Sequence, residues 1–249
     1  MNKVYQTKKL SKNIKDTIVK DDNGYYRVHM GRFNDYNSRG IFYRVTDIDA
    51  VLGEGSIVHR RLEEGLLRAE LNHPDVKGLS GPAFRQRVLK IDLKNTIAHI
   101  KKIEVIPTGE INKEFNLPTY DVYGWIKPEA PLGDKLKDIL ENPDANLAMS
   151  IRSLVYQKRI GTTVVRDVVL VSTWDVVGEP GISKATQWTA AGLEESESLD
   201  GIIDSTEDIK ELITAFEESA TTCPDGKCVI DCLGNLVKKE SNPLFNIKL

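Results

Sequence analysis

The stretch that decides the fold is residues 147–177, "LAMSIRSLVYQKRIGTTVVRDVVLVSTWDVV". The segment 147–155 has the pattern of a strand, and "KRIGT" at 158–162 predicts a hairpin turn. The density of β-branched residues over 164–177 is typical of a buried strand. The sequence therefore predicts a β-hairpin whose second strand is buried.

Polar side chains interrupt both strands of this hairpin. Side chains alternate along a strand, so Ser150 and Arg152 are expected on one face. Asp175 lies near the end of the second strand, and a buried carboxylate is costly unless it is paired. We expect Asp175 to have a hydrogen-bonding partner.

Strands and helices are also expected on both sides of the hairpin. The patterns predict strands at 25–30, 41–45, 96–106 and 120–126. The last two strands are separated by a loop containing Gly109 and Pro118. Helices are predicted at 47–65, 131–144 and about 205–216. Gly53 and Gly55 weaken the first half of the first helix.

The composition indicates an ordinary globular protein. The chain has 249 residues, of which 40% are hydrophobic and 29% charged, enough for one large or two small domains with a core. No apolar run approaches the roughly 20 residues that span a bilayer, and the first residues lack the apolar centre of a secretory signal. We expect a cytosolic setting without membrane contact. Scattered lysines without interleaved aromatic residues do not indicate nucleic acid binding.

Acidic and basic residues are unevenly distributed along the chain. Residues 194–218 contain ten acidic side chains and one lysine, a local charge of −9, and subtracting this from the net −3 leaves +6 elsewhere. We expect a mobile basic arm at 1–20, a main domain at 21–190, and a third part at 191–249 with an acidic linker, an amphipathic helix and a cysteine-containing tail.

The three cysteines do not indicate a metal site. Cys223, Cys228 and Cys232 are odd in number and have no histidine nearby, whereas a zinc site needs four ligands. A turn at "PDGK" with incidental thiols is the preferred interpretation, and no metal or cofactor is expected.

A histidine stands in an unusual place, "AELNHPD" at 69–75. Pro74 keeps His73 out of the helical region and stiffens the segment, which suits either catalysis or a structural loop. With Ser150 and Asp175, His73 completes the residue types of acyl transfer by serine: a hydroxyl, a base and an orienting acid. Chain order and spacing do not decide whether the three meet in space.

Five blocks in order resemble the prohead core proteases of myovirus-type tailed phages, whose fold is related to that of herpesvirus assemblin. The blocks are "NDYNSRGIFY" at 34–43, "AELNHP" at 69–74, "GDKL" at 133–136, "MSIRS" at 149–153 and "STWDVVGEP" at 172–180. Ile151 departs from the family pattern, which often has a second serine there.

The resemblance implies the roles of single residues. His73 matches the general base, Ser150 the nucleophile and Asp175 the orienting acid, and Arg152 matches an arginine that supports the oxyanion by its charge or its backbone N–H. His99 is the alternative third member, although structural packing is the preferred interpretation for it.

The resemblance also implies a fold and a setting. We expect an α+β, herpesvirus-protease-like fold, with a mostly antiparallel β core or barrel, flanking helices and a C-terminal acidic helical tail. The implied function is a metal-free and cofactor-free serine endopeptidase that acts inside the assembling prohead in the host cytoplasm. Phage scaffold and major capsid proteins are the implied substrates, and a homo-oligomer is left open.

Two other classes of function stay open. A protease-like scaffolding component would keep the fold without activity, and a cytosolic esterase or amidase would use a small substrate but lacks a Gly-x-Ser-x-Gly elbow. The family's preference for cleavage after glutamate leads to a further hypothesis: the enzyme cuts itself after Glu195 in "LEES" and releases the helix at 209–216, whose apolar face would tether the zymogen to scaffold.

Overall fold

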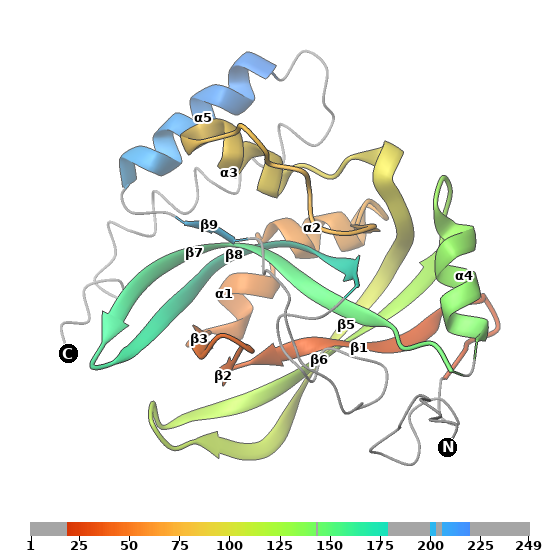
Figure 1. The fold of residues 1–249 in the computed structure, drawn as a ribbon, viewed down its shortest axis with the longest axis horizontal. Coiled ribbons are helices and arrows are strands. Elements are labelled where there is room, and N and C mark those ends of the chain that lie inside the picture. Colours follow the sequence, from red (N-terminus) through yellow and green to blue (C-terminus); the bar gives the residue numbers. More distant parts are fainter. Residues whose placement is uncertain (1–18, 143, 179–199, 203–205, 220–249) are drawn as a thin grey trace, which may run out of the picture.

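The computed structural model describes residues 19–142, 144–178, 200–202 and 206–219, and Figure 1 shows its ribbon. The elements follow in the order β1 (Tyr26–Phe33), β2 (Asp35–Tyr36), β3 (Ile41–Arg44), α1 (Ile48–Leu52), α2 (Ile57–Glu63), β4 (Arg68–Glu70), α3 (Gly81–Leu89), a 3₁₀ turn (Leu93–Asn95), β5 (Thr96–Asn112), β6 (Leu117–Pro128), α4 (Gly133–Glu141), β7 (Ala148–Ile160), β8 (Thr163–Val177), β9 (Asp200–Ile202) and α5 (Thr206–Ser219).

The strands form two sheets, which are mostly antiparallel. One sheet has the order β1-β6-β5-β4 and the other the order β2-β3-β8-β7-β9. Only the β3–β8 and β7–β9 pairs are parallel among the described strands. The α+β class and the antiparallel core are therefore confirmed, whereas neither sheet closes into a barrel within the described residues.

The two sheets meet at the ends of β4 and β8. Leu71, directly after β4, forms a parallel bridge with Val176 of β8, and the backbone N–H of Asn72 donates to the carbonyl of Val176 at 2.7 Å. This junction joins a segment of the first sheet to the hairpin of the second. It also brings the "AELNHPD" segment beside Asp175.

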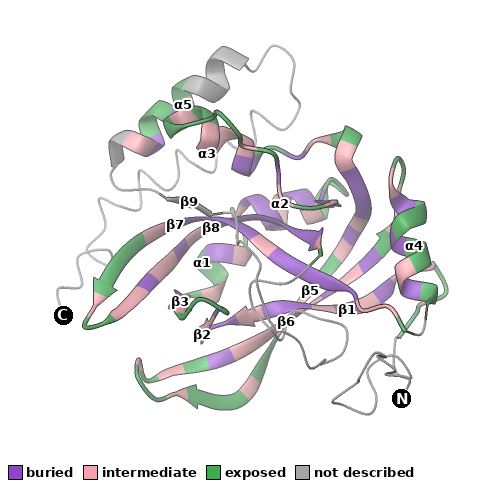
Figure 2. Ribbon diagram, in the orientation of Figure 1, coloured by how far each residue is buried: buried purple, intermediate pink, exposed green. Residues whose placement is uncertain are grey.

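Two apolar cores hold the layers together. The larger one fills the space between the sheets and includes Met30, Ile100, Val122, Met149 and Trp174, all at most 1% exposed. Figure 2 shows buried residues concentrated at the start of β5, in the first part of β7 and in the later part of β8, with exposed residues towards the far end of the β5–β6 hairpin. Full burial of a large apolar side chain stabilises a fold by roughly 1.5–3 kcal/mol, so this layer dominates the stability of the body.

The second core lies under α3 and α5. These two helices lie side by side above β7 and β9 in Figure 1. The core consists of seven buried apolar residues, drawn from α2, α3, β7, β8 and α5: Ile57, Val88, Leu89, Leu154, Leu170, Ile209 and Leu212. The predicted C-terminal amphipathic helix thus exists, but Ile209 and Leu212 are 0% exposed. The hypothesis that its apolar face is free to bind scaffold is therefore wrong.

A glycine explains why the structure has two short helices where the sequence predicted one at 47–65. The region 47–65 contains α1, with Asp47 as its N-cap, and α2, with Ser56 as its N-cap. Gly55 between them has a φ of 85°, a left-handed conformation that a helix does not contain. The side-chain oxygens of both caps accept backbone N–H groups, so each short helix starts independently.

The β5–β6 hairpin is longer than predicted. The predicted loop containing Gly109 and Pro118 lies inside the strands, which continue to Asn112 and resume at Leu117. Pairing across the strands, with an irregularity between Pro107 and Ile111, tolerates both residues near this end of the hairpin. The hairpin over β7 and β8 and helix α4 agree with the predicted elements, whereas α3 was not predicted.

Some predicted features lie outside the described residues. These are the basic arm up to residue 18, most of the acidic linker, and the three cysteines Cys223, Cys228 and Cys232. The division of the chain at residues 20 and 190 therefore stays a prediction. Among the helices that the structure describes, none is long and apolar enough to cross a bilayer.

Candidate active site

Three predicted residues from three segments meet at the junction of the sheets. Ser150 on β7 and Asp175 on β8 are directly paired across the hairpin, and His73 follows β4. His73 Nε2 lies 3.0 Å from Ser150 Oγ, and His73 Nδ1 lies 2.9 Å from Asp175 Oδ2. The arrangement is a continuous hydrogen-bonded relay from hydroxyl to imidazole to carboxylate.

The chemistry of the carboxylate determines the proton positions in this relay. Burial alone would raise the pKa of Asp175, but the charge of Arg152 and the hydrogen bonds from His73 and Arg152 outweigh it, so the pKa is lowered. An ionised carboxylate only accepts hydrogen bonds, so the Nδ1–H of His73 donates to it. The other ring nitrogen, Nε2, is then left to accept the Ser150 hydroxyl proton.

The backbone before His73 aims its ring. Asn72 has a φ of 61°, a left-handed conformation that asparagine tolerates better than most residues. The chain on either side is held, because the Leu71 carbonyl accepts Asn95 Nδ2 at 2.8 Å and the Asn72 N–H is bound to Val176. Pro74 follows and restricts the backbone of His73. The imidazole is therefore attached to a turn that hydrogen bonds and Pro74 restrain, rather than to a free loop.

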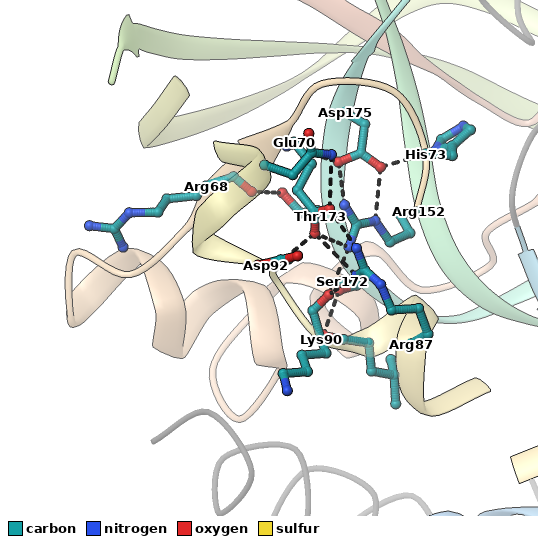
Figure 3. A network of polar contacts seen from close by, with 12 residues as sticks. Arg68, Glu70, His73, Arg87, Lys90, Asp92, Arg152, Ser172, Thr173 and Asp175 are labelled. Carbon is teal, nitrogen blue, oxygen red and sulfur yellow. Dashed lines mark hydrogen bonds and ion pairs between the residues drawn. The ribbon is translucent and has the colours of Figure 1, made fainter. Parts of the chain in front are cut away.

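Arg152 lies between two buried carboxylates (Figure 3). Its Nε and Nη2 donate to Asp175 at 2.8 and 2.5 Å, and its Nη1 donates to Glu70 and to the Lys90 carbonyl, both at 2.9 Å. Arg152, Asp175 and Glu70 are each 0% exposed. Although burial opposes the charge, Asp175 and Glu70 raise the pKa of Arg152, which stays cationic.

Glu70 extends this network to helix α3. Arg87 donates to both carboxylate oxygens of Glu70, at 3.3 and 2.8 Å. The Asp92 backbone N–H donates to Oε1 at 2.9 Å, and Asn95 Nδ2 lies 3.4 Å from Oε2. In Figure 3 the acidic and basic groups alternate from Arg87 inward to Asp175.

The remaining histidines lie elsewhere. His99 has Tyr25 Oη at 2.9 Å from its Nδ1 and donates its Nε2–H to the Gly65 carbonyl at 3.1 Å, and burial is the main cause that lowers its pKa. His29 contacts Asp121, and His59 contacts Glu63 within α2. No cluster of three or more His, Cys, Asp or Glu side chains suited to a metal occurs in the part of the chain that the structure describes.

Sequence reasoning missed most of the outer network. Neither Arg87 nor Asn95 was among the candidate residues. Arg87 lies on α3, whose sequence "SGPAFRQRVL" carries a usable signal, because Pro82 follows directly after the first helical residue. Nothing in the spacing indicates that Arg87 would meet Glu70.

Comparisons with known proteins found a matching family and a relative of the chain. The chain is 31% identical over 191 residues, which are 74% of this chain and 68% of the relative, to a protein named capsid maturation protease in Pseudomonas phage phiKZ. No solved structure matches the chain. Residues 5–229 match the profile of the Peptidase S80 family, so most of the chain is covered. Because this match covers well over half of the sequence, the chain belongs to the Peptidase S80 family.

Proposed function

We propose that the protein is a serine endopeptidase in which Ser150 is the nucleophile, His73 the general base and Asp175 the orienting acid. The observation that carries the proposal is the relay of 3.0 and 2.9 Å contacts that joins the three side chains in this order. Membership of a peptidase family supports it independently.

The proposed mechanism follows from the proton positions in the relay. Ser150 Oγ attacks the peptide carbonyl carbon while its proton passes to His73 Nε2. The imidazolium formed is stabilised by Asp175, which already accepts the Nδ1–H. His73 then gives the proton to the leaving amine, and a water molecule, deprotonated by the same ring, hydrolyses the ester on Ser150.

The contacts of the Arg152 side chain support a role other than direct oxyanion binding by its charge. Its guanidinium is bound by Asp175, by Glu70 and by the Lys90 carbonyl, away from solvent. We therefore propose that the guanidinium holds Asp175, and we assign any part of Arg152 in oxyanion binding to its backbone N–H.

The proposed setting is phage capsid maturation. A relative named capsid maturation protease supports cleavage of scaffold and major capsid proteins inside the assembling prohead, in the host cytoplasm. The relation in fold to herpesvirus assemblin and the formation of a homo-oligomer stay predictions.

Self-processing belongs to the same proposal. Cleavage after Glu195 would fall between β8 and β9, outside the described residues. Mass spectrometry of the incubated protein should show a fragment ending at Glu195, and this fragment should be absent from Ser150→Ala. A wild-type chain that digests capsid protein but stays full-length contradicts self-processing alone.

The test of the activity compares two serines on the same strand. Wild type, Ser150→Ala and Ser153→Ala are incubated with a phage scaffold or capsid protein, and fragments are followed on denaturing gels. Ser153 is a matched control, because it is also buried on β7. Cleavage by wild type and Ser153→Ala but not by Ser150→Ala is expected. If Ser150→Ala cleaves normally, Ser150 is not the nucleophile. If a folded wild-type chain cleaves nothing, the result favours an inactive scaffolding component.

A further inference from the structure

Four buried or half-buried charges form a chain that ends at the proposed catalytic histidine. From α3 inward they are Arg87, Glu70, Arg152 and Asp175, with a hydrogen bond or ion pair at every step. Positive and negative charges alternate, and the last carboxylate accepts the proton of His73 Nδ1. Figure 3 shows this order directly.

Stabilisation of the fold does not readily explain such a row of buried charged side chains. Moving charged groups out of water is costly, and well-packed apolar residues in place of a buried ion pair often give an equal or more stable fold. Glu70 and Arg152 are 0% exposed in a protein that has two apolar cores. Buried ion networks beside a reactive group are instead typical of functional sites, where they set the position and charge of that group.

The geometry gives Glu70 two routes to Asp175. Its backbone N–H donates directly to Asp175 Oδ1 at 3.1 Å. Its carboxylate binds Nη1 of Arg152, so the other edge of the guanidinium, Nε and Nη2, faces the two oxygens of Asp175. A planar guanidinium that is held on one edge is fixed on the other. Asp175 is thereby held in the orientation that receives the His73 N–H.

Glu70 is itself held from outside. Arg87, the Asp92 backbone and Asn95 all donate to it, so both oxygens of its carboxylate are held by donors besides Arg152. These donors lie on α3 and on the segment that follows it.

We propose that Glu70 is a positioning residue of the proposed peptidase, which acts through Arg152 to hold Asp175 and, through Asp175, the His73 ring. The inference rests on the proposed function only for its effect on turnover. The coupling from Glu70 to His73 is a property of the folded site and is measurable without catalysis.

The kinetic test uses Glu70→Gln, with Glu129→Gln as the matched control. Glu129 also forms a two-contact pair with an arginine, Arg68 of β4, but has no contact with the relay. Glu70→Gln should lower kcat about 10- to 100-fold with KM unchanged, the range that outer partners of functional metal ligands contribute. Glu129→Gln should leave both constants unchanged. A wild-type kcat in Glu70→Gln overturns the proposal, and so does a rise in KM alone.

Arg152→Lys tests the route through the guanidinium. It also keeps the proposal testable if Glu70→Gln does not fold. Lysine keeps every charge of the network but lacks the planar fork, so the variant should fold and lose kcat. The kcat loss of Glu70→Gln should largely disappear in an Arg152→Lys background, because both changes interrupt the same path. Additive losses in the double variant, or a wild-type kcat in Arg152→Lys, contradict action through the guanidinium.

A readout without turnover separates this inference from the proposed activity. In a Ser150→Ala background, the proton on His73 Nδ1 that is donated to a carboxylate should give a low-field NMR resonance. Glu70→Gln should shift or broaden that resonance, and Glu129→Gln should not. An unchanged resonance in Glu70→Gln overturns the coupling. If the wild type cleaves no protein but the resonance shifts as expected, the proposed function fails and the coupling stands.

Discussion

Asp175→Asn is the substitution for which the structure gives the most detailed expectation. Each oxygen of the carboxylate accepts two N–H groups: Oδ1 from the Glu70 backbone and Arg152 Nη2, and Oδ2 from His73 Nδ1 and Arg152 Nε. Asparagine has the same shape, but an NH₂ group, which only donates, replaces one of the two oxygens. Every orientation of the amide therefore opposes two N–H groups.

The two orientations are not equal in free energy. With NH₂ at the Oδ1 position, the two groups that face it remain donors, because neither a backbone amide nor an arginine loses its proton. Both therefore lack an acceptor. With NH₂ at the Oδ2 position, only Arg152 Nε remains a donor without an acceptor. The His73 ring can carry its proton on Nε2 instead and accept a hydrogen bond from the NH₂ group at Nδ1. A buried donor without an acceptor costs about 1–3 kcal/mol, so the second orientation is favoured. In it the protonated Nε2 faces Ser150 and cannot take the serine proton.

We therefore expect Asp175→Asn to lower kcat by about 10⁴-fold, the loss caused by this tautomer error in serine proteases. Ser150→Ala should cost more, on the order of 10⁶-fold. Loss of the buried charge should also lower the free energy of unfolding by about 3–5 kcal/mol, because Arg152 loses one of its two carboxylates. Single-turnover cleavage of a capsid protein and urea unfolding measure the two effects. A folded Asp175→Asn protein with a wild-type kcat would refute the reasoning about the tautomer.

Three further predictions concern the site and the body. Asn72→Gly should keep activity, whereas Asn72→Ala should lose about 1–2 kcal/mol of stability and part of kcat, because alanine disfavours the φ of 61°; thermal unfolding and cleavage rates of both variants check this. Activity should fall in acid, because protonated His73 accepts no proton from Ser150; a rate that stays flat far into the acid range contradicts a histidine base. Burial would raise the pKa of Asp121, but hydrogen bonds from His29 and Arg32 lower it from 3.8 to about 2, so its contribution to stability is complete above pH 3.8 and is lost as the pH falls towards 2. Urea unfolding across this range should show a smaller pH dependence in Asp121→Asn.

The sequence was sufficient for the parts of the site that lie on regular or restricted backbone. Ser150 and Asp175 lie on strands whose pattern is clear. Their direct pairing does not follow from the tight turn at Gly161, because that turn alone would place Ser150 opposite Thr173. Two register shifts in the hairpin, one after Arg152 and one after Leu154, bring Ser150 opposite Asp175, and the sequence gives no signal for them. Pro74 indicated a stiff backbone at His73. The positive φ of Asn72 had no such signal, because asparagine occurs in many other conformations.

The network around Glu70 was beyond local reasoning for a different reason. Its contacts with Arg152 and Asp175 span 82 and 105 residues of sequence, and Arg87 reaches it only because α3 packs beside β7. Single propensities do not determine such distant meetings. The same holds for α5, whose apolar spacing was visible but whose partner, α3, was not.

The second core has a consequence for any break in the chain between β8 and β9. One side of that core, with Leu154 and Leu170, precedes the break, and the other, with Ile209 and Leu212, follows it. Each of these residues is at most 5% exposed, and β9 adds hydrogen bonds to β7. The two pieces of a cut chain would therefore stay together as one particle on a native column and separate only in denaturant. A chain that ends before β9 would expose an apolar surface, and a separate peptide that contains β9 and α5 should restore its stability by fragment complementation.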